Sequence, residues 1–108
     1  MGAFAAPILL GKLEDWEAFM AELAGPRKAE YEDMNARMGL TGHRAWLQVT
    51  PDGHHMAVVV HDGPGGDAFM GNLATSTNGF DAWFKAKVTD VHGIDFSGPL
   101  PPAPQQRL

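Results

Sequence analysis

The sequence predicts a single α+β domain in which helices cover one face of an antiparallel sheet. Three features of the 108 residues lead to this fold class. Apolar residues recur at amphipathic helical spacing over 12–38 and again over 80–91. Between these regions, two apolar runs flank a Pro-Asp-Gly turn at 51–53, which is typical of a β-hairpin. The chain length suits one hydrophobic core.

The first part of the chain predicts a strand and then a long helical region. Residues 3–10 are apolar, lack a preceding basic residue and run into charged residues, which favours a strand over a signal peptide. The helical stripe that follows consists of Leu13, Trp16, Phe19, Met20 and Leu23. Proline is tolerated in a first helical turn and Gly39 offers a stop, so we predict one long, bent helical region over about 12–38.

The second half predicts a hairpin over 44–61, a flexible glycine-rich segment, a short helix and a final helix. The short helix contains Phe69, Met70 and Leu73. Candidate N-caps at 76–78 precede the final helix, and Gly93 is its natural stop. The resulting order is the βαββαβ pattern of a ferredoxin-like sandwich. We assign residues 1–96 to this domain and 97–108 to a proline-rich tail, part of which could add an edge strand.

Composition excludes several classes of function. Eight Lys and Arg against thirteen Asp and Glu give a net charge of −5, so a basic footprint for nucleic acid or for an acidic membrane is missing. The absence of Cys excludes disulfides, thiolate metal sites and a cysteine nucleophile. No apolar run approaches the ~20 residues of a membrane span. We therefore expect a soluble cytoplasmic protein.

The loop of the hairpin decides which side chains share a face of the sheet. With a two- or four-residue loop, Leu47 faces Val58 and Val49 faces Met56, which gives one wholly apolar face for the helices. A three-residue loop shifts the register by one and mixes the apolar and polar sets, so we predict against it. The other face then holds Arg44, Trp46, Gln48, Thr50, His55, Ala57, Val59 and His61.

That second face requires a partner. Trp46 is too apolar to be left in water, whereas Arg44 and His61 are costly to bury unpaired. Two copies packed sheet against sheet would cover the face and enclose a small pocket of aromatic and hydrogen-bonding groups. We therefore predict a homodimer that encloses a binding site for a small molecule.

Several segments together resemble a bacterial branch of the dimeric α/β-barrel superfamily. They are Phe4-Ala5-Ala6-Pro7-Ile8-Leu9, Gly11-Lys12, Arg44-Ala45-Trp46-Leu47-Gln48, Phe80-Asp81-Ala82-Trp83-Phe84-Lys85 and His92-Gly93-Ile94-Asp95. Better-known members include cofactor-independent monooxygenases of antibiotic biosynthesis, haem-degrading monooxygenases, polyketide cyclases and muconolactone isomerase. The resemblance implies a homodimer with one pocket per protomer between sheet and helices. It fixes no reaction, because one fold hosts many chemistries.

His61 is the first candidate for a catalytic residue. In the predicted register it ends the second strand opposite Arg44, beside the glycine-rich residues 62–66 that could act as a lid. A neutral imidazole there could take a proton from a phenol or a carbon acid, with Arg44 stabilising the anion. The alternative is a partly exposed histidine at a strand end.

Five further residues are candidates for substrate binding. Trp46 either stacks on a flat ligand or fills the dimer interface, and Gln48 either orients a carbonyl or makes a cross-strand hydrogen bond. Tyr31 follows the apolar stripe and could project its hydroxyl into the cavity, whose wall includes Val59. His92 either interacts with the carbonyl end of its helix or borders the pocket.

The remaining polar residues predict no metal site. His54 points to the face opposite His55, and His55 lies six residues, roughly 20 Å, from His61, so they cannot share one ion. No other spacing resembles a zinc or iron site. Asn35 and Arg37, in the second half of the helical region, are expected to face solvent.

These observations support three hypotheses. The first is a small homodimeric enzyme without metal or organic cofactor that abstracts a proton from an aromatic or polyketide-like substrate, as a monooxygenase, isomerase or cyclase. The second is a binding protein for haem or another flat hydrophobic ligand, with His61 or His92 as axial ligand. The third is a structural dimer whose mixed face is filled by side chains.

Overall fold

The computed structural model describes residues 1–108 and shows an α+β fold with a three-stranded antiparallel sheet and four helices. The strand order is β1-β3-β2. The elements in chain order are β1 (Gly2–Pro7), α1 (Leu13–Ala24), α2 (Lys28–Arg37), β2 (Gly42–Val49), β3 (His55–Asp62), a 3₁₀ turn (Gly66–Ala68), α3 (Phe69–Thr75) and α4 (Gly79–His92). None of the helices is both long enough and apolar enough to cross a membrane.

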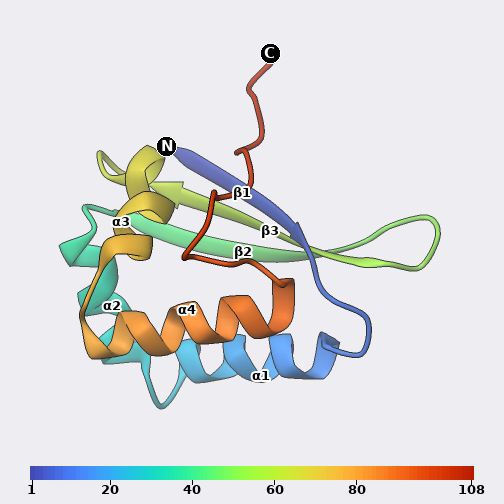
Figure 1. Cartoon of the computed structure of the whole chain (residues 1–108), viewed down its shortest axis with the longest axis horizontal. Helices are drawn as coiled ribbons and strands as arrows, with labels where there is room; N and C mark the ends of the chain where they lie inside the picture. Colours follow the sequence, from blue (N-terminus) through green and yellow to red (C-terminus); the bar gives the residue numbers. More distant parts are fainter.

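Helices α1 and α4 lie side by side along one face of the sheet (Figure 1). Their apolar stripes, which include Phe19, Leu23, Phe84 and Val88, form the main core together with buried residues of the other elements. The opposite face of the sheet stays accessible, and Trp46 on that face is 47% exposed. The core and any enclosed cavity therefore lie between the sheet and the helices.

The predicted single bent helix is two helices. Helix α1 ends at Ala24, and the chain turns through residues 25–27 before α2 begins at Lys28. Pro26 has no N–H to continue the helical ladder, so a helix running through it loses a hydrogen bond. The break lets α2 take its own direction and bury Met34 completely.

An ion pair between a buried carboxylate and a partly exposed guanidinium links α4 to α2. Both oxygens of Asp81 accept hydrogen bonds from the Arg37 guanidinium, each at 2.9 Å. The hydroxyl of Ser76 donates to the same carboxylate at 2.6 Å, and Asp81 has no exposed surface. The Arg37 guanidinium lowers the pKa of Asp81. Arg37 is exposed, as expected, but its guanidinium also holds this buried carboxylate, a role that the sequence did not predict.

The final helix confirms the sequence prediction at both ends. The Asn78 side chain accepts hydrogen bonds from the backbone N–H groups of Phe80 and Asp81, at 2.9 and 3.4 Å. Gly93 adopts a left-handed conformation with φ of 72° and ends α4. The short helix α3 is also present over Phe69–Thr75.

The fourth strand of a βαββαβ pattern is absent. After α4, Phe96 and Leu100 pack against the main core, but residues 93–108 form no strand. Residues 101–108 are exposed. The tail therefore adds no edge strand to the sheet.

The predicted register of the hairpin was wrong by one residue. His43 pairs with His61, Leu47 with Ala57, and Val49 with His55. The loop is closed by the Thr50 N–H, which donates to the His54 carbonyl at 2.8 Å, so three residues separate this pair. Gly53 has φ of 85°, and this left-handed residue is what a three-residue hairpin loop requires.

The shift by one residue exchanges the faces of one strand relative to the other. The face toward the helices carries His43, Ala45, Leu47, Ala57, Val59 and His61. The opposite face carries Arg44, Trp46, Gln48, Met56, Val58 and Val60. The residues predicted to share the semi-polar face are therefore divided between the two faces. Those in β2 lie on the outer face, and those in β3 lie under the helices.

The glycine-rich segment is a packed connection rather than a lid. Gly65 donates its N–H to the Gly39 carbonyl at 3.0 Å. A Cβ at Gly65 would clash with the carbonyl oxygen of Met38, and one at Gly66 would clash with that of His61. These close backbone approaches fix the end of β3 against the turn before β2.

Candidate functional site

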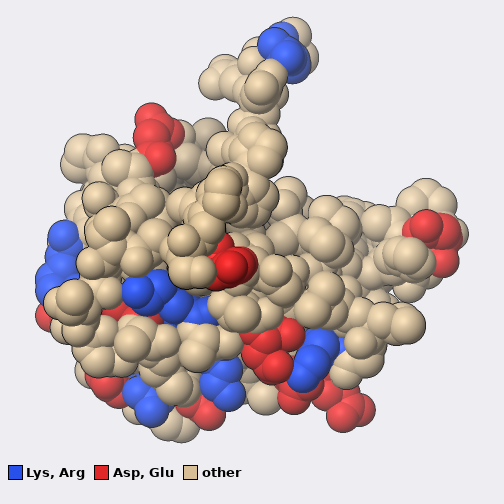
Figure 2. Space-filling model, viewed as in Figure 1, with Lys and Arg blue, Asp and Glu red and all other residues tan.

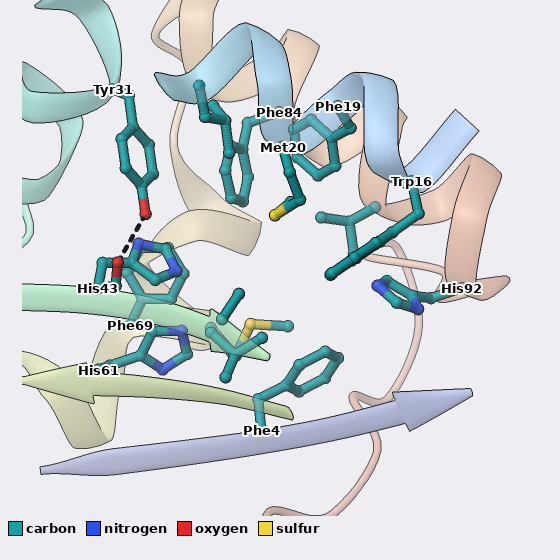
Figure 3. Close-up of a pocket in the computed structure, with 15 residues that line it drawn as sticks. Phe4, Trp16, Phe19, Met20, Tyr31, His43, His61, Phe69, Phe84 and His92 are labelled. Carbon is teal, nitrogen blue, oxygen red and sulfur yellow. Dashed lines mark hydrogen bonds between the residues drawn. The ribbon is translucent and has the colours of Figure 1, made fainter. Parts of the chain in front are cut away.

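A cavity of about 50 Å³ lies between the sheet and helices α1 and α4 (Figure 3). It shares Trp16, Met20, Leu23, Tyr31, His43 and Ala45 with an open groove of about 410 Å³ that runs between α1 and the edge strand β2. Most of the cavity wall is apolar, with Phe4, Trp16, Phe19, Met20, Phe69, Met70 and Phe84 among its members. The cavity and the groove are therefore neighbours that share one wall.

Two histidines from paired strands lie side by side in this wall. His43 and His61 are opposite each other in the ladder, and their ring centroids are 4.7 Å apart at an interplanar angle of 72°. The ring of Phe69 packs against both, at 5.0 Å from His43 and 4.4 Å from His61. Figure 3 shows the three rings grouped at one end of the cavity.

Helix α2 orients His43. Its Nδ1 lies 3.0 Å from Oδ1 of Asn35, and because that oxygen can only accept, Nδ1 carries the proton. The other ring nitrogen, Nε2, is then an unprotonated acceptor. The Tyr31 hydroxyl donates to the backbone carbonyl of His43 at 3.1 Å. Tyr31 lines the cavity, but its hydroxyl is engaged by this carbonyl. Asn35, which was expected to face solvent, holds the His43 ring.

The ring nitrogens of His61 have no hydrogen-bond partner within the protein. Its side chain is 3% exposed and makes no hydrogen bond. Every side-chain nitrogen without accessible surface has a hydrogen-bond partner, so the unpartnered ring nitrogens of His61 keep some accessible surface. His61 is also one of the residues that line the cavity. A hydrogen-bonding group of a ligand can therefore reach them.

Burial keeps both imidazoles neutral. It lowers the pKa of His43 to about 3, with a further contribution from the neighbouring His61. Burial likewise lowers the pKa of His61 to about 4, although Asp62 partly opposes the shift. At pH 7 both rings can accept a proton or a hydrogen bond, but they are weak bases.

His92 borders the same cavity from the end of α4. Its Nδ1 lies 2.8 Å from the carbonyl oxygen of Pro7 in β1, so the interaction predicted with its own helix end is replaced by one with the sheet. The Phe4 ring packs against the imidazole at a centroid distance of 6.1 Å. Burial lowers the pKa of His92.

The structure separates the predicted site residues into two groups. His61, Tyr31, Val59 and His92 line the cavity. The other group, which consists of Arg44, Trp46 and Gln48, lies on the outer face of the sheet.

Each residue of the outer group has a local partner there. Arg44 donates to Asp62 at 2.9 Å, and its guanidinium lies 5.4 Å from the centre of the Trp46 ring. Gln48 donates to the Val49 carbonyl at 3.0 Å. Arg44 therefore does not stabilise an anion beside His61. Gln48 and Trp46 likewise do not bind a ligand in the site that contains His61.

The sequence reasoning missed His43 and its partner Asn35. The signal was the Pro-Asp-Gly turn, because a glycine in the third loop position suits a three-residue hairpin loop. With that loop, the residue opposite His61 is His43 instead of Arg44. No group of three or more His, Cys, Asp or Glu side chains is arranged to hold a metal ion.

Comparisons of this chain with protein-family models, with curated proteins and with solved structures found no match. The geometry of the cavity therefore carries the functional argument.

The buried histidines predict a pH dependence of stability. Their pKa is lower in the folded than in the unfolded protein, so the unfolded chain binds more protons below about pH 6.5. Stability is complete above that pH and is lost as the pH falls toward 4. His43→Phe should reduce the slope between pH 6 and 4 by up to about 1.4 kcal/mol per pH unit.

Urea unfolding at a series of pH values measures this slope. His54→Asn serves as the control, because His54 is exposed in the hairpin loop and its replacement should leave the slope unchanged. An unchanged slope in His43→Phe would show that this imidazole titrates as it does in water.

Proposed function

We propose that this protein binds a flat, weakly acidic molecule in the cavity and transfers a proton from it to His61. The observation that carries the proposal is the pair of neutral imidazoles, His43 and His61, open to a cavity that is otherwise mostly apolar. The protein would act as a small enzyme of the isomerase, cyclase or monooxygenase type on an aromatic or polyketide-like substrate. It would need no metal or organic cofactor for the proton transfer.

The site limits the acidity of the substrate. A ring nitrogen of His61 takes the proton, and the electrons of the broken C–H or O–H bond stay on the substrate as an enolate or phenolate. Because the pKa of His61 is about 4, the transfer favours groups that are already acidic, such as the central carbon of a 1,3-dicarbonyl. In the apolar cavity the imidazolium and the anion stabilise each other strongly.

The fate of the anion distinguishes the reaction types. Return of the proton to another atom gives an isomerisation, and attack of the carbanion on a carbonyl of the same molecule gives a cyclisation. Oxygenation additionally requires dioxygen as a second substrate. The aromatic rings of Phe69 and Phe84 in the wall favour a flat substrate in each case.

Haem fits the cavity less well than a smaller molecule does. The enclosed volume of about 50 Å³ is far below the roughly 300–1,000 Å³ of pockets for larger ligands. A group of that size would have to separate α1 from the sheet. A molecule of two rings also exceeds this volume, so its binding requires flexible lining side chains such as Met20 and Met70 to move, whereas α1 can stay in place.

We further propose that the fold is related to the ferredoxin-like dimeric α/β barrels and that two copies pack through the outer face of the sheet. The order β1-β3-β2 and the helices on one face support this relationship. Trp46 is exposed on the outer face, beside Val58. In the view of Figure 2, charged side chains gather over helices α1 and α4, and the upper part of the molecule carries fewer of them. The outer face of the sheet itself carries one exposed ion pair, Arg44 with Asp62.

The dimer can be tested without knowledge of the ligand. Sedimentation equilibrium should show a dimer for the wild type and a monomer for Trp46→Glu, because the substitution buries a charge in the proposed interface. Glu17→Gln, on the exposed side of α1, is the matched control and should remain dimeric. A monomeric wild type would contradict the proposed partner.

Proton abstraction can be tested with benzoylacetone, which combines an aromatic ring with a 1,3-dicarbonyl. In D₂O, the wild type should accelerate exchange of its central protons for deuterium by about 10²–10⁴-fold over buffer, as expected for a positioned general base. His61→Phe should abolish the acceleration, and the rate should fall as the pH decreases through about 4.

NMR of the central CH₂ signal follows this exchange directly. His54→Phe, which replaces an exposed histidine of the hairpin loop, should exchange the probe as fast as the wild type. A wild type no faster than buffer, or a His61→Phe variant as fast as the wild type, would refute the proposed function.

A further inference from the structure

The third histidine of the cavity lies at the opposite end from His61. Gly2, at the start of β1, pairs with His61, whereas Pro7, at the end of β1, holds His92 through its carbonyl. Met56 is the residue opposite Pro7, and it is five residues from His61, or about 17 Å along the strand. Figure 3 shows His92 on one side of Phe4 and His61 on the other.

The contact with Pro7 determines which atom His92 presents. A carbonyl oxygen can only accept, so Nδ1 of His92 carries the proton and Nε2 is an unprotonated acceptor. The side chain is 8% exposed and makes no other hydrogen bond. Every side-chain nitrogen without accessible surface has a hydrogen-bond partner, so the unpartnered Nε2 keeps some accessible surface. His92 is also a lining residue of the cavity.

His43 uses the same arrangement at the other end. Asn35 accepts from its Nδ1, which leaves Nε2 as an acceptor near His61. The two ends of the cavity therefore each hold an imidazole whose acceptor nitrogen is set by a contact outside the cavity. A ligand that matches both ends carries a hydrogen-bond donor at each of its own ends.

The cavity also discriminates against charge. None of its lining residues is Lys, Arg, Asp or Glu. Burial lowers the pKa of all three histidines, so they supply no positive charge at pH 7. A carboxylate or phosphate would lose its hydration in the cavity without gaining a counter-ion, which is costly.

We infer that His92 is a binding residue for a second hydroxyl group and that the ligand is an uncharged molecule of about two rings with a hydroxyl donor at each end. This inference rests on the proposed function, since it takes His61 to bind the reacting end of the ligand. Phe4 and Met20 contact the apolar middle of the ligand.

Three related molecules test the inference by isothermal titration calorimetry at pH 7. They are 4,4′-dihydroxybiphenyl, 4-hydroxybiphenyl and 4′-hydroxybiphenyl-4-carboxylate. The diol should bind the wild type about tenfold more tightly than the mono-ol, equivalent to about 1.4 kcal/mol. The carboxylate should bind at least about tenfold more weakly than the mono-ol, because its charge is buried unpaired.

His92→Asn isolates the acceptor nitrogen. The shorter amide can still donate to the Pro7 carbonyl but has no atom at the position of Nε2, so the fold is retained and the second anchor is lost. The affinity for the diol should fall to that for the mono-ol, and the affinity for the mono-ol should not change. His54→Asn, on the exposed hairpin loop, should leave all three affinities as in the wild type.

Equal wild-type affinities for diol and mono-ol would overturn the inference, as would a diol preference that survives in His92→Asn. A wild type that binds none of the three molecules would also overturn it. In each of these cases, deuterium exchange of benzoylacetone shows separately whether His61 still abstracts a proton, so failure of the inference is distinguishable from failure of the proposed function.

Discussion

The three-residue loop of the hairpin is the constraint on which the site depends. Gly53 adopts the left-handed conformation that closes this loop, and the closure sets His43 opposite His61. Side chains alternate between the faces of a strand, so a loop one residue longer or shorter would move one strand's whole set to the other face. A histidine pair under the helices is thus a consequence of backbone conformation at a position ten residues from His43 and eight from His61.

The register places the imidazole rings of His43 and His61 in the mostly apolar layer between the sheet and the helices. Neighbouring residues supply hydrogen bonds to His43. Asn35 satisfies one nitrogen of His43, and Tyr31 satisfies its backbone carbonyl. Both partners belong to α2, which the ion pair of Arg37 with the buried Asp81 links to α4. Neither residue of the ion pair lines the cavity, yet the pair supports the helix that orients one of the lining imidazoles. The remaining unpaired nitrogens are what make the cavity able to recognise a ligand rather than serve only as core.

Much of the fold follows from local sequence signals, whereas the residues that line the cavity could not be identified from such signals. Asn78 and Gly93 bound α4 as capping preferences predict, since each acts through its own backbone. The prediction of which residues share a face of the sheet was wrong. The separation of apolar from polar residues favoured a hairpin loop of two or four residues, whereas Gly53 closes a loop of three. The role of Arg37 was equally invisible, because its partner Asp81 is 44 residues away and meets it only after α2 and α4 pack. Long-range pairs of this kind depend on tertiary geometry, which helical spacing alone does not specify.

The register itself is open to direct measurement by nuclear Overhauser contacts in the folded protein. The account predicts contacts between the ring protons of His43 and His61, and from both rings to Phe69. It also predicts that Arg44 shows contacts to Val60, its partner across the ladder. A spectrum that instead pairs Arg44 with His61, and leaves His43 without contacts to Phe69, would contradict the histidine pair and with it the proposed site.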